Sequence, residues 1–336
     1  MFRLSHSIVC RAVFALICLA VLSGCMSRSA PRYTITDIGT PRGSSIEVSA
    51  MNNQGHVIGS TMNTWGRQLI IWQNGKVIDA GTMNGHSTMG HCINDRGEIV
   101  GMANIEDKSH SISHAFLYTR GKYTDLTLYI KGATTQSINN RGEILLSVNS
   151  ISSLQVWKSG HGRVVPLPFK ADLLGEKIND NGWISGLIFG KNSTFDGFIL
   201  KPNGQYILMH QPGKNSYVAC LNKANQAIGL IGENPFLWTE GWLHYLPKGP
   251  YNDFRVAQLN NHGQIVGESN VGAHKSHAAL YENGRTVDLN DLIPHGSGWI
   301  LERAIGINDK GEIIGTGIQN SQIRSFLLRP LKPNKQ

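Results

Sequence analysis

The sequence lacks the short motifs by which many enzymes and metal sites are recognised. It has no paired Cys-x-x-Cys, no His-Glu-x-x-His, no calcium-loop phrase and no phosphate-binding loop. Gly296-Ser297-Gly298 is a loop and does not continue as a nucleophile elbow. We therefore predict no catalytic residues, no metal ligands and no cofactor. Paired carboxylates contributed by different repeats would escape this search, so a hydrolase or lyase stays open as an alternative.

Long amphipathic helices are also lacking, and a short phrase recurs instead. An apolar residue, Asn, two mostly polar residues and Gly appear seven times. The Asn positions are Asn52, Asn94, Asn139, Asn179, Asn222, Asn260 and Asn308. Their mean period of about 43 residues is typical of stacked supersecondary units such as four-stranded propeller blades.

Each repeat contains four short apolar runs separated by turn residues, which predicts four antiparallel strands, A to D. The A–B turn needs a positive φ, and Asn225 replaces Gly there in the fifth copy. Asn74-Gly75 is a strong hairpin signal for the C–D turn. A second Gly, such as Gly101, lies seven residues after each repeat Asn; the third copy has Leu146 there instead. We expect this Gly to make room for a bulky strand-C residue such as Tyr118.

The seventh repeat ends after three strands, at Phe326-Leu327-Leu328. Tyr33 to Gly39 resembles the missing strand D, so we predict that it completes the last blade and closes a ring. We thus predict an all-β fold, a single seven-bladed β-propeller of four-stranded antiparallel blades over residues 33–330, with a C-terminal tail at 331–336. A β-sandwich or two small barrels would also suit regular strands, but would not explain seven copies and a missing strand.

Residues 1–24 have the features of an export signal. Arg3 and Arg11 precede an apolar run too short for an ordinary membrane-spanning helix. The run ends in Leu22-Ser23-Gly24-Cys25, which resembles the bacterial lipobox and implies cleavage before Cys25 and lipidation of that residue. Met26 after it favours the outer membrane, by resemblance to Gram-negative lipoproteins. We expect residues 25–32 to be a tether. A plain secretory signal is the alternative.

The formal net charge of +8 includes Arg3 and Arg11, which leaves +6 after the signal. The basic residues are scattered, with no Lys/Arg block, so we expect no nucleic-acid partner. The excess of positive charge would favour anionic lipid headgroups or polysaccharide as partners. Alternatively, the charged side chains only keep the surface solvated. Cys92 and Cys220 remain after the signal and lipidation site; they occupy equivalent positions three blades apart, too far for a disulfide, and we predict two buried free thiols.

His114-Ala115-Phe116-Leu117-Tyr118, preceded by the second repeat phrase, resembles the HAF repeat family of bacterial extracellular proteins. His277-Ala278-Ala279-Leu280-Tyr281 is a second near match. The resemblance covers roughly residues 33–330 and implies an exported β-propeller. It carries no established activity, so no functional residues are transferred from it.

Thirteen His residues raise the question of a metal. His110 and His114 occupy positions before strand C that correspond to those of His274 and His277. On a metal-site hypothesis, these residues would be ligands from two blades. The alternative, which we favour, is that His114 and His277 open strand C and bond a neighbouring backbone, because copies two and six are far apart around a ring.

Functional residues concentrate on loops, so we look to the B–C and D–A loops around the channel mouth. Their ligand-binding candidates are Trp65, Asp107, His110, Tyr251, Asp253, Arg255, Trp299 and Arg303. Alternatively, Trp299 and Phe254 seal the inner strands. The leading hypothesis is a non-enzymatic, lipid-anchored binding or scaffold module of the bacterial cell envelope, whose partners are the membrane and an envelope protein or glycan. A metal-stabilised scaffold is a third possibility.

Overall fold

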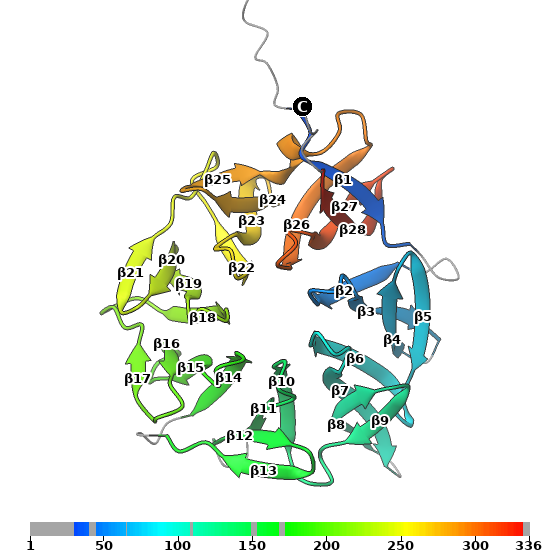
Figure 1. Cartoon of the computed structure of the whole chain (residues 1–336), viewed down its shortest axis with the longest axis vertical. Helices are drawn as coiled ribbons and strands as arrows, with labels where there is room; N and C mark the ends of the chain where they lie inside the picture. The colour runs from blue at the N-terminus through cyan, green and yellow to red at the C-terminus, as the bar shows by residue number, and fades with distance from the viewer. Residues whose placement is uncertain are drawn as a thin grey trace, which may run out of the picture.

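Seven four-stranded antiparallel sheets surround a central axis (Figure 1). The computed structural model describes residues 30–39, 45–64, 66–107, 110–148, 153–167 and 172–331. The predicted seven-bladed, all-β propeller is confirmed. The predicted signal at 1–24, Cys25, most of the tether and the tail beyond 331 lie outside the described residues.

The first four blades follow one another along the chain, each in the strand order A to D. Blade one has β2 (Ile46–Met51), β3 (Val57–Asn63), β4 (Gly66–Gln73) and β5 (Lys76–Gly81). Blade two has β6 (Gly85–Ile93), β7 (Ile99–Asp107), β8 (His110–Thr119) and β9 (Lys122–Asp125). Blade three has β10 (Ala133–Ile138), β11 (Ile144–Val148), β12 (Ser153–Lys158) and β13 (His161–Val164). Blade four has β14 (Leu173–Ile178), β15 (Ile184–Phe189), β16 (Phe195–Leu200) and β17 (Tyr206–Leu208).

Blades five to seven complete the ring, and the last of them includes the N-terminal strand. Blade five has β18 (Ser216–Leu221), β19 (Ala227–Ile231), β20 (Asn234–Thr239) and β21 (Trp242–Tyr245). Blade six has β22 (Arg255–Leu259), β23 (Ile265–Gly272), β24 (Lys275–Glu282) and β25 (Arg285–Asp288), followed by the short 3-10 helix η3 (Leu289–Leu292). Blade seven has β26 (Trp299–Ile307), β27 (Ile313–Gln319), β28 (Gln322–Pro330) and β1 (Tyr33–Asp37).

The N-terminal strand closes the ring as predicted. β1 pairs antiparallel with β28, from Tyr33 opposite Pro330 to Asp37 opposite Phe326. Tyr33 and Ile38 are each only 2% exposed, so this segment contributes core as well as backbone pairing. Because β1 covers the open edge of β28, the seventh sheet has the same four strands as the others.

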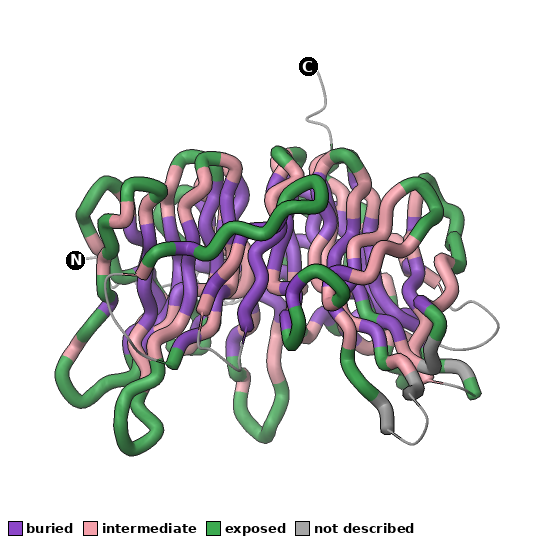
Figure 2. The backbone as a smooth tube through the Cα atoms, turned by 90° about the horizontal axis from the view of Figure 1, so that it is seen from below, coloured by how far each residue is buried: buried purple, intermediate pink, exposed green. Residues whose placement is uncertain are grey.

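The two ends of the strands form two different faces. The A–B and C–D turns lie on one side, which we name the turn face, and the B–C and D–A connections lie on the other, which we name the loop face. Figure 2 shows the ring edge-on, with buried residues in the blades and exposed residues at both rims. Asn74 and Gly75 have φ of 51° and 79°, and Asn225 has φ of 59°, so the predicted left-handed turn residues are confirmed.

The second Gly makes room for a bulky strand-C side chain, as predicted, but for a different residue and for backbone as well. A Cβ on Gly101 would lie 1.9 Å from the carbonyl oxygen of Met89 on strand A and 2.8 Å from the Phe116 ring. It thus makes room for a bulged strand-A backbone and for the Phe of strand C, rather than for Tyr118. In blade three Leu146 pairs with Gln155, where blade two pairs Gly101 with Phe116. The larger strand-B side chain stands opposite a smaller, non-aromatic one.

Apolar contacts join each blade to the next. Ile46, Val48 and Val57 of blade one pack with Ile314 and Leu327 of blade seven in one buried cluster. Burial of such side chains stabilises the fold by roughly 1.5–3 kcal/mol for each large one. Blades one and seven therefore share an apolar core, although each is a separate sheet.

Candidate functional site: the central channel and the loop face

A closed ring of seven Asn side chains surrounds the channel at the turn face. Asn94 shows the pattern: its Oδ1 accepts from the backbone nitrogens of Arg96 and Glu98, both at 3.0 Å. Its Nδ2 donates to Glu98 Oε2 at 2.6 Å and to the backbone oxygen of Asn139 in the next blade at 3.1 Å. All the hydrogen-bonding groups of this buried amide are thereby satisfied.

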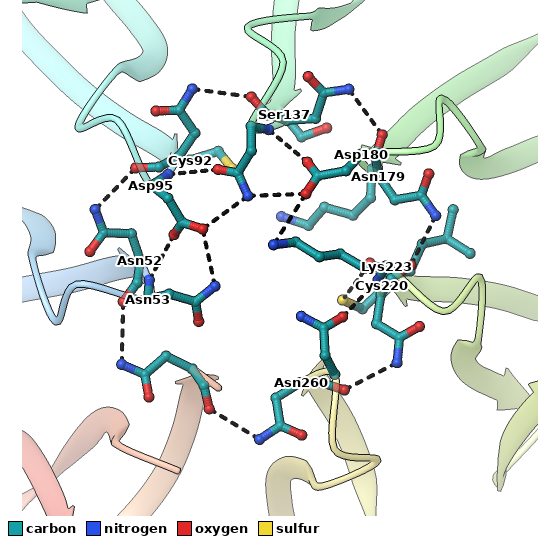
Figure 3. Close-up of a pocket in the computed structure, with 18 of the residues that line it drawn as sticks. Asn52, Asn53, Cys92, Asp95, Ser137, Asn179, Asp180, Cys220, Lys223 and Asn260 are labelled. Carbon is teal, nitrogen blue, oxygen red and sulfur yellow. Dashed lines mark hydrogen bonds and ion pairs between the residues drawn. The ribbon is translucent and has the colours of Figure 1, made fainter. Parts of the chain in front are cut away.

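The same bond from Nδ2 to the next repeat's backbone oxygen occurs between every pair of neighbouring blades (Figure 3). The successive distances, starting from Asn52, are 3.0, 3.1, 2.9, 2.9, 3.1, 3.0 and 3.3 Å, the last from Asn308 back to Asn52. From the sequence this Asn is predicted only as part of a turn, and its partner in the next blade is not predicted. Its recurrence in all seven copies, even where the turn Gly is replaced, is the signal that pointed to it.

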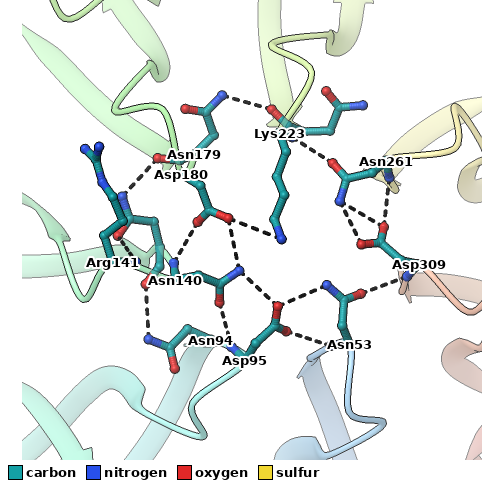
Figure 4. A network of polar contacts seen from close by, with 12 residues as sticks. Asn53, Asn94, Asp95, Asn140, Arg141, Asn179, Asp180, Lys223, Asn261 and Asp309 are labelled. Carbon is teal, nitrogen blue, oxygen red and sulfur yellow. Dashed lines mark hydrogen bonds and ion pairs between the residues drawn. The ribbon is translucent and has the colours of Figure 1, made fainter.

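A second ring is formed by the residues that follow these Asn (Figure 4). The backbone nitrogen of one residue donates to Oδ1 of the next, as from Asn53 to Asp95 at 2.9 Å and from Asp95 to Asn140 at 2.7 Å. Lys223 interrupts the series, since it has no side-chain oxygen. Its Nζ lies 3.4 Å from Asp180 Oδ2 instead. The turn-face mouth of the channel is therefore lined by amides and carboxylates with one ammonium group.

The channel interior holds a cavity of about 170 Å³. Its lining includes residues two positions before the repeat Asn, among them Cys92, Ser137, Lys177 and Cys220. These residues follow a bulge in strand A, as between Gly90 and Cys92. A bulge re-aims the side chains of a strand, and here it occurs in every blade.

Both cysteines are free thiols, as predicted, but they are not equally buried. Cys220 is 2% exposed, whereas Cys92 is only partly buried. The prediction of two buried thiols is thus correct for Cys220 and wrong for Cys92, which opens onto the cavity. Burial raises the pKa of the Cys220 thiol, and the nearby Lys177 ammonium acts in the opposite direction.

At the loop-face end of the strands, charged groups of neighbouring blades meet. Arg255 on β22 pairs in the ladder with Glu268 on β23, and Arg303 Nε from β26 lies 3.7 Å from Glu268 Oε2. Arg255 Nε also lies 4.0 Å from Asp253 Oδ2. The two Arg side chains are about 60% exposed. Burial raises the pKa of Tyr217. The nearby charges of Arg255 and Arg303 lower this pKa, and that of Glu268 raises it.

Three predicted candidates, Asp253, Arg255 and Arg303, are therefore brought together, and Glu268 and Tyr217 join them. The sequence analysis missed the last two because neither lies on a loop. Glu268 follows the second Gly of its repeat within β23, and Tyr217 lies within β18. Only the placement of three consecutive blades shows that they belong to the same cluster.

Tyr251 belongs to a different group on the same face. Its hydroxyl donates to Asp288 Oδ2 at 2.8 Å, and His277 Nδ1 lies 2.6 Å from the same oxygen. The Tyr251 and His277 rings meet edge to face. Burial and the hydrogen bond to Asp288 raise the pKa of Tyr251 to about 12, so its phenol keeps its proton at neutral pH.

The His residues of the HAF-like triplets bond carboxylates, and the expected bond to a neighbouring backbone is wrong. His114 Nδ1 lies 2.7 Å from Asp125 Oδ2, as His277 does from Asp288. Each Asp ends strand D, where Oδ1 also accepts a backbone nitrogen two residues on. The His thus ties strand C to the end of strand D within its own blade.

The other candidates contribute less to a described surface. Trp65 lies outside the described residues, and so do the side chains of Asp107 and His110, whose backbones pair at the end of β7 and β8. Trp299 is 8% exposed and meets the Phe326 ring edge to face. Phe254 is fully buried. For these two aromatics, burial supports the alternative that they seal the inner strands.

Neither a metal cluster nor a membrane helix is found in the part of the chain that the structure describes. No three His, Cys, Asp or Glu side chains there gather closely enough to hold a metal ion. No helix in those residues is both long and apolar enough to cross a bilayer.

Comparisons with known proteins identify the fold. No known family and no curated protein matches the chain. Virginiamycin B lyase from Staphylococcus aureus has a similar structure, with a TM-score of 0.55 and 12% identity over 89% of this chain and 99% of that one. The structure of YCF48 bound to D1 peptide has a TM-score of 0.57 and 10% identity, over 91% of this chain and 97% of that one. The β-propeller domain of the Trilobed protease from Pyrococcus furiosus has a TM-score of 0.55 and 11% identity, over 87% of this chain and 97% of that one. At these identities the similarity establishes the β-propeller fold alone.

Proposed function

We propose that this chain is a binding module of the bacterial cell envelope, of the HAF repeat type, which engages an envelope protein through its loop face. The observation that carries the proposal is a set of exposed apolar side chains distributed around that face, which also carries the arginines of the channel mouth. The set comprises Met62, Met89, Ile112, Phe189, Ile300 and Ile323, each at least 40% exposed. Such a combination of apolar and Arg side chains suits a protein interface.

A protein partner is favoured over a glycan by the kinds of side chain exposed. Sugar rings would stack on flat aromatic groups, but Trp299 and Phe254 are buried. Phe189 and Tyr251 are exposed aromatics on this face, but the other exposed residues of the set are Met and Ile. Arg255 and Arg303 are only loosely paired with Asp253 and Glu268, so they remain able to meet carboxylates of a partner. A glycan partner is retained as an outcome of the test.

The proposal includes an outer-membrane lipid anchor at Cys25. Its support is the sequence alone: a basic start, a short apolar run and the lipobox-like Leu22-Ser23-Gly24-Cys25. Several acyl chains on one residue hold a protein firmly to a bilayer, where a single chain is marginal. Mass spectrometry of the N-terminal peptide tests this part: a mass without acyl groups on Cys25 would contradict it.

The test of binding is recovery of partners from envelope extract by the native protein and by two matched variants. Phe189→Asp with Ile300→Asp alters the loop face, and Tyr206→Asp with Trp242→Asp alters exposed outer strands. We expect the first pair to abolish recovery of a specific protein and the second pair to leave it unchanged. Equal recovery by both variants, or recovery of glycan only, would contradict a loop-face protein site.

A hydrolase or lyase is the second candidate. It is favoured by the group in which Tyr251 and His277 share Asp288, on a fold that virginiamycin B lyase also adopts. Against it, the His–Asp pair recurs as His114 and Asp125 in blade two, which is typical of a structural element of the repeat. If this group is catalytic, Tyr251→Phe abolishes turnover of a substrate without changing the melting temperature.

A further inference from the structure

The chain enters the propeller at the turn face. The backbone nitrogen of Leu331 donates to the oxygen of Arg32 at 2.8 Å, and Tyr33 pairs with Pro330. In the other six blades a C–D turn joins the strands at this place. In blade seven the two ends of the propeller stand there instead, and residues 30–32 lead into β1 from the turn face.

The same face carries unpaired positive charge. Its C–D turns and the adjoining strands bear exposed cations: Lys76 in blade one, Arg120 and Lys122 in blade two, Lys158 and Arg163 in blade three and Arg285 in blade six. Within the described residues, none of these six makes an ion pair. They lie far apart in sequence, and the blade period brings them to one side of the ring.

Carboxylates on the turn face are largely neutralised by other residues. Arg96 and Arg141 bond Glu98 and Glu143 through Nη2 at 2.5 and 2.6 Å. Arg32 pairs with Glu282, and Arg329 Nε lies 3.0 Å from Glu312 Oε1. Asp95 and Asp309 at the channel mouth and Glu240 on the C–D turn of blade five make no ion pair in the described part of the chain. The six unpaired cations outnumber these three carboxylates, so the charge that this face presents is positive.

A cavity of about 180 Å³ opens between blades three and four. Arg141, Arg163 and Lys201 line it with a single carboxylate, Glu143. Arg141 is engaged with Glu143 through Nε and Nη2. Lys201 Nζ lies over the Trp183 ring, 5.3 Å from its centroid, and like Arg163 makes no ion pair in the described residues, so these two cations can meet an added anion. The cavity offers a place for one anionic headgroup within the basic face.

We propose that the turn face lies against an anionic membrane surface, so that the loop face points away from the bilayer. This orientation rests on the proposed anchor at Cys25, whereas the affinity of the face for anionic lipid does not. Anchor and basic face act on the same side: the acyl chains hold the protein at the bilayer, and the cations orient it. Each basic side chain near an anionic surface strengthens binding about fivefold.

The experiment uses the mature chain, residues 25–336, with Cys25→Ser so that no acyl chain is added. Its binding to vesicles of phosphatidylglycerol mixed with phosphatidylcholine is compared with binding to phosphatidylcholine alone. We expect binding only to the first, weakened by added salt because screening shortens the reach of the charges.

Two triple variants with the same net charge locate the face. Lys76→Ala, Lys122→Ala and Lys158→Ala remove turn-face cations, and Lys191→Ala, Lys214→Ala and Lys275→Ala remove loop-face ones. We expect a loss on the order of a hundredfold for the first and no change for the second. Equal losses, or binding that does not depend on anionic lipid, would overturn the proposal. Absence of acyl groups on Cys25 in cells would contradict the anchor and leave the vesicle result standing.

Discussion

Asn308 Nδ2 donates to the backbone oxygen of Asn52 at 3.3 Å, across 256 residues of sequence. This contact joins the last repeat to the first and completes the ring of seven Asn side chains. At the outer edge, the β1–β28 pairing within blade seven joins the N-terminal strand to the C-terminal one. Closure of the propeller is thus made twice, once at the channel and once at the rim.

The Asn ring should contribute strongly to stability. Asn94→Ala removes four hydrogen bonds and leaves the partly buried backbone nitrogens of Arg96 and Glu98 without their acceptor. We expect the free energy of unfolding to fall by about 2–4 kcal/mol, measured by urea denaturation. Asn203→Ala is the control, because this exposed Asn accepts a single bond from Gln205. A similar loss in both variants would contradict the role of the ring.

Removal of residues 33–39 should destroy cooperative melting. The deletion exposes the edge of β28 and removes the buried side chains of Tyr33 and Ile38. We expect a broad transition at lower temperature by calorimetry, together with self-association through the free edge. Thr34→Ala, on the exposed side of the same strand, should melt like the native chain. If the truncated chain melted likewise, the ring would not depend on this strand.

Glu282 should make ring closure sensitive to acid. Its hydrogen bond with Arg32 lowers its pKa below the usual 4.5, with a further contribution from Gln264. A carboxyl with a lowered folded pKa adds stability above its unfolded pKa, and that stability is lost as the pH falls through the folded value. We expect the melting temperature of the native chain to drop more steeply below pH 4.5 than that of Glu282→Gln.

The exposed ion pair of Glu47 and Arg67 provides the control for that measurement. Glu47→Gln should follow the pH profile of the native chain. An identical profile for Glu282→Gln would show that the Arg32–Glu282 contact does not stabilise the closed ring.

The two thiols should react at different rates in the folded protein. Both thiols border the channel cavity, but Cys92 is only partly buried, whereas Cys220 is buried and its pKa is raised by burial. We expect a thiol reagent to modify Cys92 first, and both residues to react after denaturation without reductant, as read from intact mass. An unmodified, linked pair after denaturation would contradict the placement of blades two and five.

The sequence predicted the features of this fold that repeat locally. Copies of the Asn phrase located the blades, the incomplete seventh copy indicated closure by Tyr33 to Gly39, and Asn225 marked a left-handed turn. Contacts between repeats were missed, because a bond such as Asn94 to Asn139 depends on how two blades pack. The contact between Glu268 and Arg303 likewise depends on how two blades pack. The pairing of Leu146 with Gln155, where blade two pairs Gly with Phe, depends on how strands B and C face each other within blade three.

The candidate site was predicted only in its location. The loops were expected to carry the ligand, and the apolar side chains exposed on that face agree with this choice without testing it. Which aromatics point outward could not be predicted, since burial of Trp299 depends on the Phe326 ring across its own blade. The basic side chains were scattered along the sequence, and their gathering on the turn face emerged only from the ring.

The most direct measurement is photo-crosslinking in living cells, from single sites on the full-length protein. A photoreactive residue is placed at Phe189 or Ile300 on the loop face, or at Val77 or Trp242 on the outer strands, all of which are exposed. The proposed function predicts one discrete protein adduct from the two loop-face sites and none from the outer strands. An adduct from the outer strands only, or none from the loop face, would contradict it.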